Sequence, residues 1–108
     1  MRLSVNYFQS QQLKILFFGT DTFSVASLEA LNREKNYGSC IERLETCCVL
    51  NNQMSAVKSY CNKHSVKLHA WPPPTALCQE FDLGIVASFG RMFPARVINA
   101  FPRFALNS

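Results

Sequence analysis

Two mainly apolar runs of strand length stand out in the hydrophobic pattern of this chain. The first is "LKILFFG" at 13–19, and the second is the apolar part of "DLGIVASFG" at 82–90. Apolar runs without alternation are typical of strands that are buried on both faces of a parallel sheet. The pattern therefore predicts two buried parallel strands, with residues 14–18 at the centre of the sheet.

A helical pattern follows the first of these strands. Thr20 or Asp21 can cap the helix, and the polar stretch 32–39, which contains a glycine, is expected to end it. The apolar side chains expected on its inner face are Phe23, Val25, Ala26, Leu28, Ala30 and Leu31.

Shorter segments continue the alternation of strands and helices. Residues 43–50, "RLETCCVL", predict a second strand that Glu45 interrupts, and Ser55 can cap a helix over 56–64. Val57, Tyr60 and Cys61 share one face of that helix. "VKLHAW" at 66–71 predicts a short third strand, and the three prolines after it exclude a continuing helix.

The last part of the chain completes the pattern. "LCQEF" at 77–81 predicts one or two helical turns, Pro94 suits the start of a helix over 94–101, and "FALN" at 104–107 predicts a fifth strand. Strands that alternate with helices indicate right-handed crossovers and a sheet covered on both faces. We therefore predict an α/β fold: a Rossmann-like doubly wound parallel sheet of four or five strands, which binds ligands at the carboxyl ends of its strands.

Composition narrows the classes of function. The 108 residues fit one domain, and 48% hydrophobic with 17% charged residues is typical of a globular chain. No apolar run reaches the roughly 20 residues that a membrane helix needs. The net charge of +4 permits contact with RNA, but the scattered basic residues also fit an ordinary solvated surface. We expect neither a membrane nor a DNA partner.

The five cysteines favour packing over a disulfide framework. Their number is odd, and Cys47 and Cys48 are adjacent, which suits buried thiols in a reducing compartment. Cys61 and His64 have half of a zinc-ligand spacing, with His69 nearby, but no second pair completes four ligands. We therefore expect no metal.

Residues 1–13 have the composition of a leader. They contain no acidic residue, one arginine and several uncharged polar residues, which indicates a weak mitochondrial transit segment. A tail that carries no targeting information is the alternative.

The segment after the first strand does not carry a dinucleotide-binding fingerprint. "FFGTDTF" has one glycine where Gly-x-Gly-x-x-Gly has three, so NAD and FAD are not expected as cofactors. Gly19 taken by itself is more typical of an ordinary turn residue than of a binding site.

Three longer stretches together resemble the methionyl-tRNA formyltransferase family, and its mitochondrial members in particular. They are "KILFFGTDTFSVASLEAL", "VKSYCNKHSVKLHAWP" and "FDLGIVASFGRMFPARVINAFPRFALN". The resemblance covers about residues 13–107, and "KNYGSCIERLETCC" at 35–48 is its least typical part. The resemblance is specific because two features occur in the same chain. Gly19-Thr20 precedes an aromatic residue, and Ala-Ser-Phe-Gly-Arg at 87–91 is followed by Pro94.

The resemblance implies formyl transfer from formyl-tetrahydrofolate to the amino group of initiator methionyl-tRNA, at the start of translation. It implies that Gly19, Thr20 and Phe23 lie near the tRNA acceptor end. It also implies a folate site formed by Ser88, Phe89, Gly90, Arg91 and Met92. From the residues alone, the segment 88–92 also fits a strand end with Phe89 and Met92 in the core, and Phe23 also fits a core position.

The resemblance further implies a catalytic asparagine at Asn107. The histidine and aspartate of the family's catalytic centre have no counterpart in these 108 residues, and nothing places His64 or His69 beside Asn107. We therefore expect residues 14–108 to be a truncated formyltransferase catalytic domain that is inactive alone, in the mitochondrial matrix or alternatively the cytoplasm. A non-catalytic folate-binding or partner-binding module is the alternative.

Overall fold

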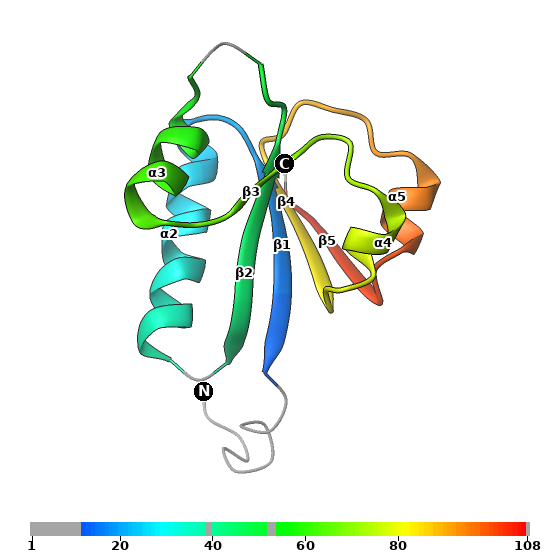
Figure 1. The fold of residues 1–108 in the computed structure, drawn as a ribbon, viewed down its shortest axis with the longest axis horizontal. Helices are drawn as coiled ribbons and strands as arrows, with labels where there is room; N and C mark the ends of the chain where they lie inside the picture. Colours follow the sequence, from blue (N-terminus) through cyan, green and yellow to red (C-terminus); the bar gives the residue numbers. More distant parts are fainter. Residues whose placement is uncertain (1–11, 39, 52–53, 108) are drawn as a thin grey trace.

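The computed structural model describes residues 12–38, 40–51 and 54–107, so most of the expected leader lies outside the described residues. Within these ranges the chain alternates between strands and helices (Figure 1). The elements are β1 (Leu13–Gly19), α2 (Thr22–Tyr37), β2 (Ile41–Cys48), α3 (Ala56–His64), β3 (Leu68–Ala70), α4 (Thr75–Cys78), β4 (Leu83–Ala87), α5 (Ala95–Asn99) and β5 (Arg103–Asn107).

The five strands form one parallel sheet in the order β3-β2-β1-β4-β5. The chain winds outward from β1 through α2 and α3 to β3, and then returns through α4 to the other side of β1. This order is that of a Rossmann-like doubly wound α/β fold. The predicted fold class and the central position of residues 14–18 are therefore confirmed.

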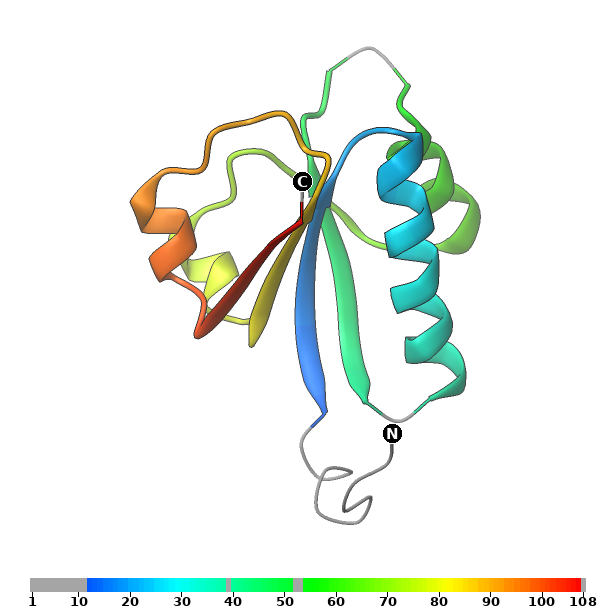
Figure 2. The same ribbon diagram turned by 180° about the vertical axis from the view of Figure 1, so that it is seen from behind.

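Helices cover both faces of the sheet, and each face has its own apolar core (Figures 1 and 2). Alternate residues of β1 point to opposite faces. Ile15 and Phe17 belong to the core under α2 and α3, whereas Leu16 and Phe18 belong to the core under α4 and α5. Burial on both faces explains why the sequence of β1 shows no alternation of apolar and polar residues.

The inner face of α2 differs from the predicted one. Its buried side chains are Ser24, Leu28 and Asn32, which repeat every four residues, and Phe23 is 81% exposed. Ala26 and Ala30 are also exposed, so their prediction as inward-facing residues was wrong. The helix continues through most of the polar stretch 32–39, to Tyr37, and Gly38 caps its end.

Strand β2 continues through Glu45, so the prediction that this residue interrupts the strand was wrong. Its carboxylate accepts hydrogen bonds from Arg43 Nε at 2.7 Å and from His69 Nε2 at 2.6 Å. Burial alone would raise the pKa of Glu45, but the hydrogen bonds and charges of Arg43 and His69 outweigh burial and leave this pKa below its ordinary value. The strand therefore tolerates a largely buried charge because that charge is paired.

Candidate functional site

The carboxyl ends of three neighbouring strands align at one edge of the sheet. Gly19 in β1 is paired with Ala87 in β4, and Ala87 is paired with Asn107 in β5. Thr20 and the segment 88–92 follow directly after these strand ends. The register thus brings the backbone of the three predicted groups of site residues to the same edge, where doubly wound sheets bind ligands.

Buried Ser24 joins the start of α2 to the end of β4. Its hydroxyl accepts a hydrogen bond from the Thr20 amide at 3.2 Å and donates to the carbonyl oxygen of Ala87. Its own amide donates to Asp21 Oδ1 at 3.0 Å, which makes Asp21 the N-cap of α2. No role for Ser24 was predicted from the sequence. Ser24 does stand three residues after Asp21, and that spacing is typical of a contact between an N-cap and the first turn of its helix.

Gly19 allows α2 to lie close to β1. A Cβ atom at this position would come within 2.7 Å of Phe17 Cε2 and of Ser24 Cβ, which is closer than non-bonded carbon atoms approach. Gly19 is the last residue of β1. The lack of a side chain at Gly19 therefore allows β1 and α2 to pack closely at this point.

The loop after β4 has two residues in the left-handed region of backbone conformation. Ser88 has a φ of 52° and Gly90 has a φ of 77°. A Cβ atom at Gly90 would meet no other atom within 4 Å, so the backbone angle rather than lack of space favours glycine there. Non-glycine residues in this region cost about 1–3 kcal/mol and cluster at functional sites, so the conformation of Ser88 marks this loop as a candidate site.

A cavity of about 430 Å³ opens beside this loop, and the paired residues Val86 of β4 and Leu106 of β5 also line it. We call it the β4–β5 cavity; its lining residues are Val86, Ser88, Phe89, Gly90, Arg91, Met92 and Leu106. Its volume lies within the range of small-molecule sites, about 300–1,000 Å³. All five residues predicted to bind folate line it. Met92 is 92% exposed and so lies outside the core, whereas Phe89 is buried.

A cluster of aromatic rings holds Phe89 in place. The ring of Phe89 lies 5.0 Å from that of Trp71 and 5.8 Å from that of Phe18, as measured between ring centroids. Phe93 lies 4.7 Å from Trp71 in the same cluster. These edge contacts fix the inner wall of the β4–β5 cavity. Sequence reasoning did not connect Trp71 with this site.

A second cavity, of about 300 Å³, also borders this loop. We call it the lysine cavity; its lining residues are Thr20, Val49, Asn51, Met54, Ser55, Lys58, Phe89, Gly90 and Arg91. It shares the segment 89–91 with the β4–β5 cavity. Of the three residues predicted near the tRNA acceptor end, Thr20 lines this cavity, whereas Gly19 and Phe23 line neither cavity.

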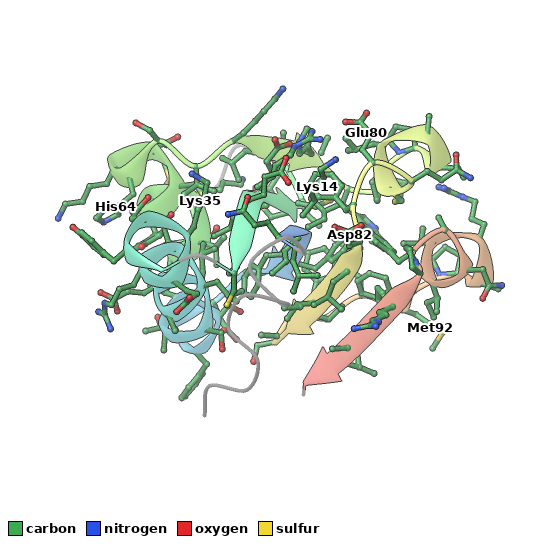
Figure 3. The ribbon with its side chains drawn as sticks, turned by 90° about the horizontal axis from the view of Figure 1, so that it is seen from below. Lys14, Lys35, His64, Glu80, Asp82 and Met92 are labelled. Atoms are coloured by element: carbon green, nitrogen blue, oxygen red, sulfur yellow. The ribbon has the colours of Figure 1, made fainter. Side chains whose placement is uncertain are left out.

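The two histidines lie away from the end of β5. His69 is in β3, which forms the opposite edge of the sheet from β5. Figure 3 shows His64, on α3, at the opposite side of the molecule from Met92. Neither histidine lines either cavity. The described residues therefore bring Asn107 to the candidate edge through its backbone and keep both histidines elsewhere.

Four of the five cysteines are buried, whereas Cys40 is exposed and departs from the expectation of buried thiols. Burial raises the pKa of Cys47, Cys48, Cys61 and Cys78, so these thiols are neutral and unreactive near pH 7.

Among the described residues, no three histidine, cysteine or acidic side chains gather in a metal-binding group. None of the helices in the same part of the chain has the length and hydropathy to cross a membrane.

No protein-family model matches the chain, but individual proteins do. The mitochondrial methionyl-tRNA formyltransferase of Rattus norvegicus is 36% identical over 98 residues, which is 87% of this chain and 25% of that protein. The mitochondrial methionyl-tRNA formyltransferase of Homo sapiens is 35% identical over 98 residues, again 87% of this chain and 25% of that protein. The methionyl-tRNA formyltransferase of Mycoplasma pneumoniae is 30% identical over 83% of this chain and 32% of that protein. The chain spans about a quarter to a third of these relatives, and the similarity supports a relationship with their family.

Proposed function

We propose that this chain belongs to the methionyl-tRNA formyltransferase family and forms the folate-binding part of its catalytic domain. The reaction would transfer a formyl group from formyl-tetrahydrofolate to the amino group of initiator methionyl-tRNA. One observation carries the proposal: Ser88, Phe89, Gly90, Arg91 and Met92, which the resemblance assigns to folate, line one cavity at the carboxyl edge of the sheet. The edge strand beside that cavity ends at Asn107.

The chemistry of the β4–β5 cavity suits a reduced pterin. A pterin is a flat ring system with hydrogen-bond donors and acceptors along its edge. The cavity offers apolar surface from Val86, Phe89 and Leu106, together with the backbone groups of the loop after β4. Pockets that combine apolar walls with a few backbone donors and acceptors are typical of cofactor sites.

Catalysis needs more than the binding of folate. Attack of the amine on the formyl carbon forms a tetrahedral oxyanion, which the side-chain amide of an asparagine such as Asn107 can stabilise. The amine must also lose a proton, which a positioned acid or base accelerates by about 10²–10⁴-fold. The histidine and aspartate that the resemblance implies for this role are not among the 108 residues. We therefore propose that these 108 residues bind folate but do not catalyse formyl transfer by themselves.

Isothermal titration of the 108-residue chain with 5-formyl-tetrahydrofolate, a stable formyl-folate, tests the proposal. We expect saturable binding that Leu106→Glu weakens by about tenfold or more, because a carboxylate in the apolar cavity would be desolvated and would repel the anionic folate. Leu106 lines the cavity and is 69% exposed, so this change spares the core. Ile98→Glu, on an exposed face of α5, is the matched control. Absence of binding, or equal loss in both variants, would contradict the proposal.

A mitochondrial matrix location follows from the same proposal. The two mammalian relatives are mitochondrial by name, and residues 1–13 of this chain contain no acidic residue. Fusion of residues 1–20 to a fluorescent reporter should give mitochondrial fluorescence. A diffuse cytosolic signal would count against this location and favour the cytoplasm.

A further inference from the structure

Strand β5 forms one edge of the described sheet and is paired on one side. Its residues pair in parallel with β4, and β4 pairs in turn with β1. Among the described residues, no strand lies along the other side of β5 (Figure 2). The backbone amides and carbonyls that point outward from such an edge form a template on which a further strand can pair.

The opposite edge of the sheet is less suited to pairing. Strand β3 has only three residues, and the three prolines at 72–74 follow it closely. Short edge strands offer few groups to a partner, and proline has no amide hydrogen to donate. Strand β5, by contrast, has five residues, contains no proline and carries one charge, on Arg103. We therefore expect β5 to be the edge that accepts a strand.

The side chains of β5 suit the pairing of this strand with a second copy of itself. Phe104 packs against the core under α4 and α5, and Leu106, which is 69% exposed, points to the same face. Ala105 points to the other face and is exposed. In an antiparallel pair centred on Ala105, Phe104 of each copy lies opposite Leu106 of the other. The pair would thus cover both exposed leucines.

The charge on β5 favours the antiparallel direction. In the pair centred on Ala105, Arg103 of each copy lies opposite Asn107 of the other. The two arginines are then four residues apart, about 14 Å along the strands, which exceeds the screening length of about 8–10 Å in physiological salt. Parallel pairing in register would place them about 5 Å apart, where like charges destabilise a sheet. A two-fold antiparallel pair also closes on itself, because it leaves β3 as the outer edge on both sides.

We propose that two copies of this chain associate through antiparallel pairing of β5 with β5, about a two-fold axis at Ala105. The pairing joins the two parallel sheets into one continuous sheet. The contact consists of five strand residues from each copy, so the association is weak and reversible. Ala105 lines neither cavity, so the association is independent of the proposed folate site.

Sedimentation velocity of the 108-residue chain, over about 1 µM to 1 mM, tests this association. We expect a monomer at low concentration and a dimer at high concentration. Ala105→Lys and Ala105→Glu should each weaken the dimer about fivefold, because like charges then face each other across the two-fold axis. An equimolar mixture of the two variants should restore the dimer, since lysine then faces glutamate, and this restoration would also show that both variants are folded.

Ala30→Lys is the matched control for the added charge. Ala30 is exposed on α2, away from β5, so this change should leave the dimer as it is. Hydrogen exchange distinguishes strand pairing from other association: exchange of amides in β5 should slow as the protein concentration rises, whereas exchange in α2 should not. A chain that stays monomeric up to about 1 mM would overturn the proposal. So would a dimer that Ala105→Lys leaves intact, a mixture of the two variants that does not pair, or growth into larger aggregates without a dimer.

Discussion

Replacement of Glu45 by glutamine should destabilise the fold, by an amount that depends on pH. The carboxylate is 13% exposed and accepts hydrogen bonds from Arg43 and His69 at 2.7 and 2.6 Å. Charge-assisted hydrogen bonds contribute about 1.5–3 kcal/mol each, and partial exposure reduces that amount. Arg43 keeps Glu80 as a second partner at 2.9 Å, so the substitution does not strip it of every carboxylate. We therefore expect Glu45→Gln to lower the free energy of unfolding by about 2 kcal/mol at pH 7.

The direction of the pKa shift sets the pH dependence. The folded protein holds the pKa of Glu45 below its ordinary value, so the ionised carboxylate stabilises the fold above the unfolded pKa. That contribution is lost as the pH falls from about 4.3, the unfolded value, through the lower folded pKa. Once the carboxyl group is protonated it resembles the glutamine amide in charge. The difference between the two chains should therefore shrink toward zero in acid.

Urea unfolding followed by circular dichroism, at intervals from pH 7 down to pH 3, measures this difference. Glu42→Gln is the matched control because Glu42 lies in the same strand but is exposed. A difference at pH 7 no larger than that of the control would refute the reasoning. So would a difference that stays constant down to the lowest pH at which the chain remains folded.

The remaining predictions concern the candidate edge. Ser24→Ala should lower the free energy of unfolding by about 1–3 kcal/mol, because it removes the hydroxyl that pairs with the Thr20 amide and the Ala87 carbonyl oxygen. Ser59→Ala, at an exposed position, is the control, and equal effects of the two changes would contradict the structural role of Ser24. Gly90→Ala should cost about 1–2 kcal/mol through its backbone angle, and a neutral result would show that the loop adopts another conformation. The 108-residue chain, mixed with formyl-tetrahydrofolate and charged initiator tRNA, should give no formyl-methionyl product above background; turnover that Asn107→Ala abolishes would contradict this prediction.

Much of the fold could be predicted because its main strands are buried on both faces. Such strands read as apolar runs, and the crossover rules then allow few topologies. The errors arose where polar side chains are buried with partners. Asn32 lies inside because its amide donates to the Tyr60 hydroxyl at 3.2 Å, and Glu45 lies within a strand because Arg43 and His69 pair with it. Tyr60 and His69 come from other elements than the residues they contact, so hydrophobic periodicity could not reveal these partnerships.

The candidate site could be predicted in its placement but not in its shape. Parallel strands end at a common edge, so the predicted topology by itself implies that Gly19, the segment 88–92 and Asn107 lie near one another. The division of that edge into two cavities depends on the left-handed conformation of Ser88 and Gly90 and on the direction of Lys58 from α3. These features follow from loop geometry, for which the sequence offers only the glycine as a signal.

The aromatic cluster gives the candidate edge its own optical signal. Trp71 is the single tryptophan of the chain, and its ring lies 5.0 Å from Phe89 and 4.7 Å from Phe93. Indole emission depends on the packing and polarity around the ring, so the whole tryptophan fluorescence of this protein originates beside one wall of the β4–β5 cavity. A shift in that emission with no change in far-ultraviolet dichroism would record a movement of the loop after β4 while the sheet stays intact. An unmodified sample can thus follow events at this edge separately from the unfolding of the rest of the molecule.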